Sequence, residues 1–326
     1  MKTILITDTH FGVKQNSTTW LNSQLNILYN QILPLIKKIK EKESVRIIHC
    51  GDVFDSRNTI NTLTAIKVSE AFKILAKECP IYIVLGNHDF YSPNDSTIST
   101  LNLVFDKEEN IHLIQNTIEV LLNEHDEPED LLVPWYQFDD AELLSKHVKE
   151  FKPKRIFCHT DLLNLSDEYK VLLKDIKLYS GHIHTPYFKD NLFNLGSTYA
   201  LNFADANAKR GFYVLDNISN ELKFIESKDI ILFYRFYNDE IFNINPNILA
   251  KHYVECYIDK SNLIIDAYID RINELSKKIK NFTIIPNIQV SESIENIEFK
   301  NFNILDFCKT CIPEYLLSKF NLITTN

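Results

Sequence analysis

The sequence lacks any apolar run of about eighteen residues, the length that a transmembrane helix needs, so we expect no membrane-spanning helix. The chain start is apolar for only about four positions before Asp8, which is too short for the core of a secretory signal peptide. Internal repeats and low-complexity linkers are also missing. We therefore expect a cytoplasmic protein, or one of the host-cell cytoplasm if the source is a virus.

Positive charge is scarce. The 326 residues include 35 Lys and Arg against 44 Asp and Glu, which gives a formal net charge of −9. Free-standing proteins that bind nucleic acids tightly usually carry basic stripes that displace counterions, and this composition argues mildly against that class. A nuclease is not excluded, because bound metal ions or a partner subunit can supply the positive charge.

The paired cysteines of a structural zinc site are missing as well. Among the six cysteines only Cys308 and Cys311 lie close together, and no second pair accompanies them. We interpret these two as helical neighbours on a partly buried face and not as a zinc or redox site.

What is present is ample apolar material, since 45% of the residues are hydrophobic and 12% are aromatic, as expected of a globular protein. The first two thirds alternate strand-like and helix-like patterns, with helices at residues 21–40 and 62–77. This order predicts an α/β fold with a mixed sheet and a helix layer on each face. The expected strands are residues 4–6, 45–50, 81–85, 111–114, 119–122, 130–133, 155–159, 178–180, 192–195 and 211–214.

The pattern changes near residues 225–229, which divides the chain into three parts. Residues 1–225 form the large domain, and residues 226–295 form a small α+β unit with strands at 230–235, 253–258 and 283–290 and a helix at 263–279. Residues 296–326 form a C-terminal tail, whose apolar stretch 302–320 is predicted to be helical.

Polar motifs follow five of the predicted strands, where strand-end loops collect functional groups. Each motif alone is weak, because an Asp-x-His or a lone His after a strand is more often a cap or a hydrogen-bonded polar residue. Together, in this order, they point to one site. The motifs are Asp8-Thr9-His10, Gly51-Asp52, Gly86-Asn87-His88-Asp89, His159 and Gly181-His182-Ile183-His184.

Such residues are the ligands of a two-metal site. Two divalent ions roughly 3.5–4 Å apart need a shared carboxylate to offset their repulsion, with oxygen and imidazole ligands around them. Asp52 is the natural bridge. The pair His182 and His184 has i, i+2 spacing, which places both rings on one side of an extended segment. Gly51, Gly86 and Gly181, each directly before a ligand, let the backbone turn sharply there.

The motif set D-x-H, G-D, G-N-H-D, H and G-H-x-H resembles that of the calcineurin-like metallophosphoesterases, which implies a mixed-sheet, four-layer sandwich. The resemblance assigns His88 as the general acid and Asp89 as the residue that orients it. It also implies two divalent ions, Mn²⁺ in preference to Mg²⁺ or Fe²⁺. One ion takes Asp8, His10, Asp52 and His184 as ligands, and the other takes Asp52, Asn87, His159 and His182.

Within that superfamily, the stretch from Gly51 to Ser56, G-D-V-F-D-S, resembles the SbcD-like DNA repair nucleases. The segment from Val133 to Trp135 and the stretch from Leu195 to Gly211 bring the chain nearer to the nuclease subunits of T-even-phage-type recombination endonucleases. The resemblance implies a metal-dependent exo- or endodeoxyribonuclease of recombination and double-strand-break repair.

The same resemblance implies DNA and an SMC-like coiled-coil ATPase as partners. The 226–295 unit then caps the site and guides DNA, and the tail binds the ATPase. Some relatives have a His three residues after the bridging Asp, implicated in exonuclease action. Asp55 stands there in this chain, so that role is not carried over.

A homodimer is also implied, through helix 62–77 with Leu63, Ile66, Ala71, Ile74 and Leu75 and through the loop 91–103. The alternative for these apolar residues is that they face the sheet. For the whole chain, the alternative is a phosphodiesterase acting on cyclic nucleotides or other nucleotides, which the acidic charge favours and in which the last third acts as a lid.

Overall fold

The computed structural model describes residues 1–92, 95–105 and 108–287. The predicted tail 296–326, with Cys308 and Cys311, lies outside the described residues, as do residues 288–295 of the small unit. In the described part, no helix has both the length and the apolar character needed to cross a membrane.

One six-stranded sheet has the order β14-β13-β1-β2-β3-β6. Strands β1, β2, β3 and β6 are parallel, and β13 and β14 extend the edge next to β1 in antiparallel fashion. The parallel strands are covered on both faces, which explains their nearly continuous apolar sequences. The bounds are β1 Lys2–Ile6, β2 Val45–His49, β3 Ile81–Val84, β6 Ile111–Ile114, β13 Gly211–Asp216 and β14 Leu222–Glu226.

The other six-stranded sheet has the order β11-β12-β10-β9-β8-β7. Its four central strands are parallel, whereas the edge strands β7 and β11 pair in antiparallel fashion. The bounds are β7 Glu119–Leu122, β8 Pro128–Val133, β9 Arg155–His159, β10 Lys177–Gly181, β11 Tyr187–Lys189 and β12 Leu192–Asn194.

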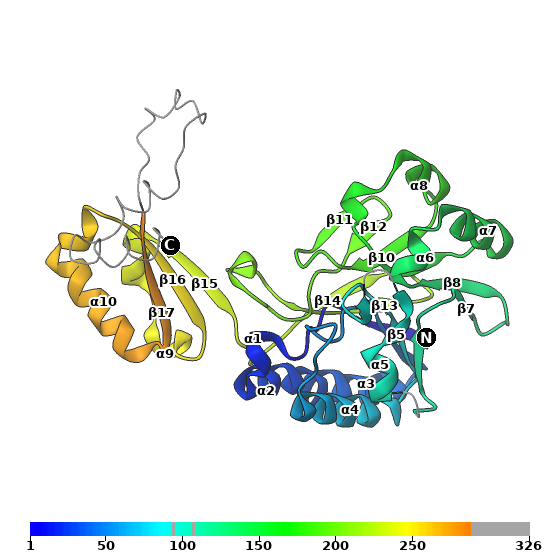
Figure 1. Ribbon diagram of the computed structural model, residues 1–326, viewed down its shortest axis with the longest axis horizontal. Coiled ribbons are helices and arrows are strands. Elements are labelled where there is room, and N and C mark those ends of the chain that lie inside the picture. Colours follow the sequence, from blue (N-terminus) through cyan, green and yellow to red (C-terminus); the bar gives the residue numbers. More distant parts are fainter. Residues whose placement is uncertain (93–94, 106–107, 288–326) are drawn as a thin grey trace, which may run out of the picture.

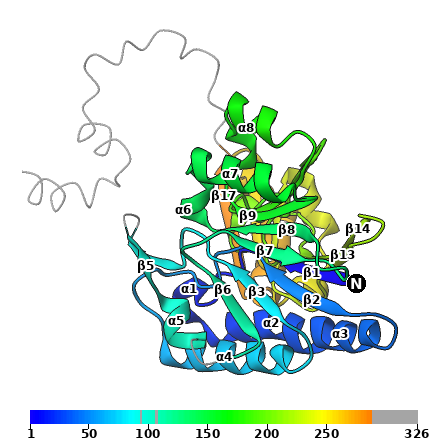
Figure 2. The same ribbon diagram turned by 90° about the vertical axis from the view of Figure 1, so that its right-hand side faces the viewer.

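The two sheets pack face to face between two helix layers (Figures 1 and 2). Leu5, Ile48 and Phe157 belong to the apolar core between the sheets. Helices α2 (Thr18–Ile27), α3 (Leu33–Lys40) and α4 (Thr62–Ala76) cover the first sheet, and α6 (Trp135–Phe138), α7 (Ala141–Phe151) and α8 (Asp167–Leu172) lie over the second. The predicted four-layer sandwich is confirmed.

In the first third of the chain, local structure departs from expectation at two places. The helix predicted over residues 21–40 is interrupted by a π-helical turn, Leu28–Ile32, between α2 and α3. A hairpin of β4 (Phe90–Ser92) and β5 (Asp95–Ser99) follows the G-N-H-D motif, and α5 (Thr100–Phe105) follows the hairpin. The polar stretch around the hairpin has no clear alternation, so sequence patterning did not predict it.

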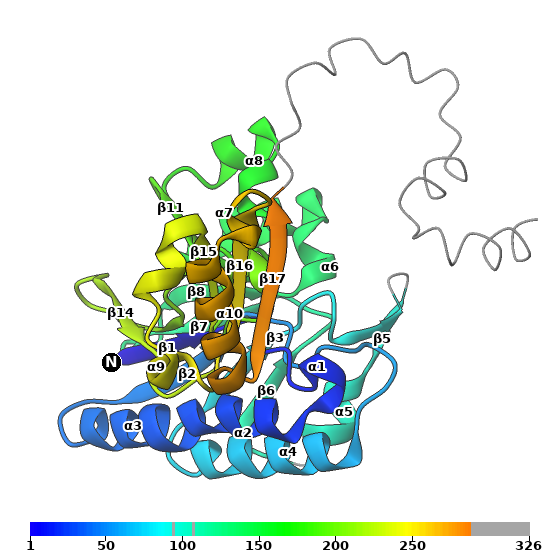
Figure 3. The ribbon, with the colours of Figure 1, turned by 90° about the vertical axis from the view of Figure 1, so that its left-hand side faces the viewer.

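Beyond β14 the chain builds a separate three-stranded parallel sheet, β15-β16-β17. Its strands are β15 (Phe233–Tyr237), β16 (Tyr253–Asp259) and β17 (Asn281–Asn287), with α9 (Pro246–Leu249) and α10 (Asp266–Lys278). A core of its own includes Val254, Ile258 and Leu275. Figures 1 and 3 show this β15–β17 unit beside the sandwich, next to α1 (Val13–Asn16) and α2. The division at residue 225 remains a prediction.

Candidate metal centre

The predicted ligands converge at one end of the sandwich, where the parallel strands finish. Asp8 and His10 follow β1, Asp52 follows β2, Asn87 follows β3, and His159 ends β9. His182 and His184 follow β10, which completes the predicted set. This is the edge at which parallel α/β sheets collect functional side chains.

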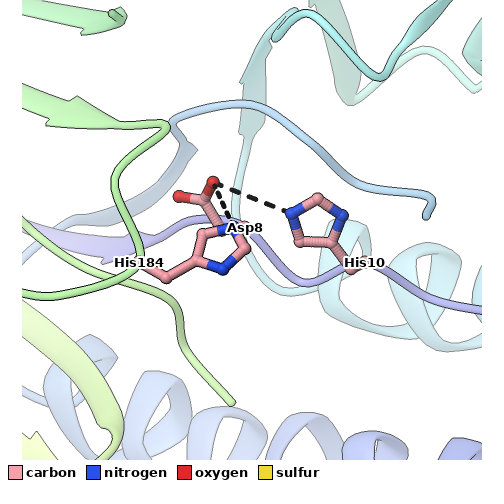
Figure 4. A group of neighbouring side chains, drawn as sticks. All are labelled: Asp8, His10 and His184. Carbon is pink, nitrogen blue, oxygen red and sulfur yellow. Dashed lines mark ion pairs between the residues drawn. The ribbon is translucent and has the colours of Figure 1, made fainter. Parts of the chain in front are cut away.

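Three of these side chains form one group, Asp8, His10 and His184 (Figure 4). Oδ1 of Asp8 lies 3.9 Å from Nε2 of His10 and 3.7 Å from Nε2 of His184. Both ring nitrogens of His10 are buried and have no hydrogen-bond partner. A buried polar atom without a partner is costly, and a bound cation would satisfy Nε2 of His10.

A second group surrounds Asp52. Oδ2 of Asp52 lies 3.3 Å from Nε2 of His159, and Oδ1 of Asn87 lies 3.0 Å from the same nitrogen and 3.1 Å from Nδ1 of His182. The His159 ring donates from Nδ1 to the Cys50 carbonyl at 2.7 Å, which fixes the tautomer. Its Nε2 is therefore the nitrogen left to bind a metal.

The backbone at the site is held in an unfavourable conformation. Asp8, His10, Asp52 and His182 all have positive φ angles, of 48°, 42°, 58° and 81°. Such conformations cost about 1–3 kcal/mol each and persist only where the surroundings enforce them. Here the amide of Asp8 donates to the Gly51 carbonyl at 3.0 Å, and the amide of His10 donates to the Asp52 carbonyl at 3.1 Å.

Glycine is required next to these ligands for reasons of space. A Cβ atom on Gly86 would lie 2.4 Å from Oδ1 of Asp52. One on Gly181 would lie 2.6 Å from Oδ2 of Asp8 and 2.0 Å from the Thr7 hydroxyl oxygen. Gly86 and Gly181 therefore let the strand ends approach the carboxylates closely, which is a different reason from the sharp turn expected from the sequence.

Burial and neighbouring charges shift the pKa values of the ionisable groups in opposite directions. Burial lowers the pKa of His10 to about 3, so its ring is neutral at neutral pH. Burial also disfavours charge on His159, but Asp52 and then Asp8 overcome this and raise the pKa of His159 to about 9. Burial opposes ionisation of Asp52, yet the charge of His159 holds the pKa of that carboxyl below its usual value. These surroundings therefore favour ionised Asp52, which is the form that binds cations.

Asp89 lies elsewhere than the sequence suggested. Its buried carboxylate accepts hydrogen bonds from the amides of Asp52 and Val53 at 2.8 and 2.9 Å, and from that of Gly86 at 2.9 Å. It therefore supports the loops that carry Asp52 and Asn87, and not the His88 ring. Burial, and then the charge of Asp52, raises the pKa of Asp89 to about 7.

His88 is oriented by a group that the sequence did not indicate. Its Nδ1 lies 2.8 Å from the backbone carbonyl of Asp55, and its amide donates to Oδ1 of Asp52 at 2.8 Å. A carbonyl can only accept, so Nδ1 carries a proton and Nε2 remains for a substrate. The ring lines a cavity of about 350 Å³. A larger cavity of about 540 Å³, near Met1 and Asn123, lies away from these ligands.

Two further side chains of the site were not predicted as site residues. The Thr7 hydroxyl donates to Oδ2 of Asp8 at 2.6 Å, and the Trp135 ring lies 4.8 Å from the His182 ring. Thr7 follows the first predicted strand, and Trp135 belongs to the segment that resembles the phage-type nuclease subunits, a resemblance that gives it no role. Their contacts with ligands come only from tertiary packing.

The calcineurin-like phosphoesterase family model matches residues 1–186, which is more than half of the chain and includes all seven predicted ligands. The chain belongs to that family. Its members are hydrolases that use divalent metal ions, and the side chains around Asp8 and Asp52 suit such ions.

Individual relatives of this phosphoesterase are distant. Exonuclease subunit 1 of Enterobacteria phage T4 is 24% identical over 237 residues, covering 69% of this chain and 67% of the phage protein. The DNA double-strand break repair protein Mre11 of Methanococcus maripaludis is 23% identical over 347 residues, covering 98% of this chain and 80% of its own. A solved structure of an archaeal phosphodiesterase covers 70% of this chain and 100% of its own, with a TM-score of 0.36 and 15% identity.

Proposed function

We propose that this phosphoesterase is the nuclease subunit of a DNA recombination and double-strand-break repair complex, in which it hydrolyses phosphodiester bonds. The observation that carries the proposal is the position of Asp52 between His10 and His159, whose Nε2 atoms lie 3.7 and 3.3 Å from its Oδ2, next to the cavity that His88 lines. Similarity to a named exonuclease subunit and to a named double-strand-break repair protein supports DNA as the substrate.

The proposed centre holds two divalent ions, with Mn²⁺ preferred over Mg²⁺ or Fe²⁺. When bound, the ions supply Lewis acidity and lower the pKa of a water molecule toward neutrality. Asp52 serves both sites, because its Oδ2 faces His10 at 3.7 Å as well as His159 at 3.3 Å. The other ligands of one ion are Asp8, His10 and His184, and those of the other are Asn87, His159 and His182.

His88 is the proposed general acid. Its Nδ1 is committed to the Asp55 carbonyl, so the ring can donate from Nε2 only when both nitrogens are protonated. In that form the ring gives the Nε2 proton to the leaving oxygen and returns to its neutral tautomer. The fixed Nδ1 contact keeps the ring oriented through both states.

A second copy and an ATPase complete the proposed complex. The described part of α4 exposes Leu63 and Ile66, and the nearby hairpin and α5 expose Ile98 and Leu103, which together could form a self-complementary apolar surface. Ala71 and Leu75 do not belong to it, because they are buried against the first sheet. The SMC-like ATPase is proposed from the motif resemblance alone, since the tail lies outside the described residues.

The test is a cleavage assay with end-labelled linear double-stranded DNA, run with Mn²⁺ or Mg²⁺, with and without EDTA, beside bis-p-nitrophenyl phosphate. The proposal predicts metal-dependent cutting of DNA that is lost in Asp52→Asn. Hydrolysis of bis-p-nitrophenyl phosphate and of cyclic nucleotides without cutting of DNA would reject the nuclease and favour the small-molecule phosphodiesterase.

A further inference from the structure

A run of left-handed residues follows the first metal-ligand motif. Lys14, Gln15 and Asn16 have φ angles of 56°, 57° and 58°, and Gly12 before them has 101°. Three consecutive non-glycine residues in this conformation are rare, because each Cβ approaches the following carbonyl too closely. Such strain survives only where the surroundings enforce it, and it marks segments with a function.

Hydrogen bonds to neighbouring residues hold this turn in its left-handed conformation. The amide of Asn16 donates to the Gly12 carbonyl at 2.8 Å, and the amide of Val13 donates to the His10 carbonyl at 3.1 Å. From α4, the hydroxyl of Thr64 donates to Oδ1 of Asn16 at 3.2 Å. The turn is thus fixed directly to the His10 loop, and its geometry follows that of the metal centre.

The turn brings a free positive charge to the catalytic cavity. Lys14 lines the cavity together with His10, His88 and Asp55, and it is the one lysine or arginine among the described lining residues. Within the described part of the chain its ammonium group forms no hydrogen bond and no ion pair. The charge of Lys14 acts to lower the pKa of Asp55, which burial raises, but the two side chains do not form an ion pair.

Three aromatic rings hold this ammonium group. Nζ of Lys14 lies 5.2 Å from the ring centre of Phe233, 5.8 Å from that of Tyr253 and 5.9 Å from that of Trp20. Trp20 belongs to the sandwich, whereas Phe233 and Tyr253 belong to the β15–β17 unit. A lysine over ring faces keeps its charge available, because the rings carry no formal negative charge that would neutralise it.

We propose that Lys14 contacts the substrate phosphate next to the scissile one, and that the rings of Trp20, Phe233 and Tyr253 position it for that contact. This inference rests on the proposed nuclease function and specifies it: the preferred substrate is a polynucleotide and not an isolated phosphodiester. The β15–β17 unit then contributes to specificity by placing the lysine.

A purely structural role for Lys14 would explain fewer of these observations. The three rings already pack on one another, with centres 5.0–5.6 Å apart, and they share a core with Ala200 and Ile231, so the junction does not need a cation. A structural lysine also requires neither a left-handed turn nor a place in the cavity wall.

The test compares Lys14→Met and Lys14→Arg with the unmodified full chain, and uses Lys38→Met, an exposed lysine on α3, as the control. Cleavage of double-stranded DNA and of bis-p-nitrophenyl phosphate is measured with Mn²⁺ over a series of NaCl concentrations. In Lys14→Met, we expect kcat/KM for DNA to fall about tenfold relative to that for bis-p-nitrophenyl phosphate, as for one lost charge-assisted hydrogen bond.

The salt dependence gives the sharper readout. Loss of one phosphate contact should make the slope of log kcat/KM for DNA against log salt shallower by about 0.9. Lys14→Arg should keep the slope, and Lys38→Met should match the unmodified chain. An unchanged slope in Lys14→Met, or an equal fall on both substrates with a lower Tm, would overturn the assignment. If the unmodified chain hydrolyses bis-p-nitrophenyl phosphate but not DNA, the proposed function itself fails, and this inference with it.

The aromatic part is tested by a double-mutant cycle with Tyr253→Leu. If the ring acts by placing Lys14, Tyr253→Leu should reproduce part of the loss on DNA, and adding it to Lys14→Met should cause little further loss. Independent, multiplicative losses would show that the rings do not act through the lysine.

Discussion

Oδ2 of Asp52 lies 3.3 Å from Nε2 of His159 and 3.7 Å from Nε2 of His10, so one carboxylate oxygen faces both groups of candidate ligands. Asp8 is the residue that the two groups have in common, but its distances below 4 Å are to His10 and His184. We therefore propose Asp52 as the shared ligand and Asp8 as a ligand of one ion.

The first prediction separates the two carboxylates. Asp52→Asn should abolish activity and weaken binding of both ions, because a bridging carboxylate contributes to both sites. Asp8→Asn should weaken mainly one. Elemental analysis after dialysis counts the metal per chain, with Asp55→Asn as a control near the site. Two full equivalents retained by Asp52→Asn would remove the bridge assignment.

His88→Ser should lower turnover by about a hundredfold or more while both ions stay bound, because general acid catalysis contributes typically 10²–10⁴-fold. Steady-state kinetics and metal counting on the same preparation test this. Loss of a metal together with activity would mean that His88 is a ligand and not an acid.

Sequence alone could predict the ligand set because the motifs end strands, and parallel strands finish at one edge of a sheet. It could not predict the partner of Asp89, whose three amide donors come from two loops. The placement of Lys14 depends on rings more than two hundred residues away, at Phe233 and Tyr253. Contacts of this kind follow from packing and leave no local pattern.

The apolar residues of α4 show the same limit. Helical spacing predicts that Leu63, Ile66, Ala71 and Leu75 lie on α4, but it does not say which of them meet the sheet. The structure buries Ala71 and Leu75 and exposes Leu63 and Ile66. By contrast, α7 could have been predicted, since Asp140 caps it and Leu144 and Val148 are spaced as a buried helix face.

The exposed residues of α4 lead to a prediction about assembly. The chain should form a weak homodimer, seen as an average mass above one chain that rises with concentration in light scattering after size exclusion. Ile66→Lys should shift it to monomer, because a charge would be buried at the interface. The control is Ile218→Lys at the exposed β13–β14 turn. A strict monomer at every concentration, with and without the ATPase partner, would contradict the dimer.

His252 should make stability depend on acid pH. Its buried Nδ1 accepts from the Leu232 amide at 3.0 Å, and burial, followed by the charge of Lys251, lowers its pKa from 6.5 to about 4. As pH falls below 6.5, His252 takes up a proton in the unfolded chain but stays neutral in the folded chain. The free energy of unfolding therefore decreases down to about pH 4. The contribution of this one group is on the order of 3 kcal/mol.

His252→Asn keeps an acceptor but cannot titrate, so its stability should fall less between pH 7 and about pH 4 than that of the unmodified chain. Urea unfolding in EDTA at several pH values measures the difference and removes any effect of bound metal. Parallel pH curves for the two proteins would show that His252 is already free to protonate in the folded state.

The existence of two ions that share Asp52 is tested most directly by anomalous X-ray diffraction from crystals grown with Mn²⁺. The account predicts two anomalous peaks, one bound by Asp8, His10 and His184, the other by Asn87, His159 and His182, with Asp52 in contact with both. A single peak at saturating Mn²⁺, or two peaks without Asp52 between them, would contradict it.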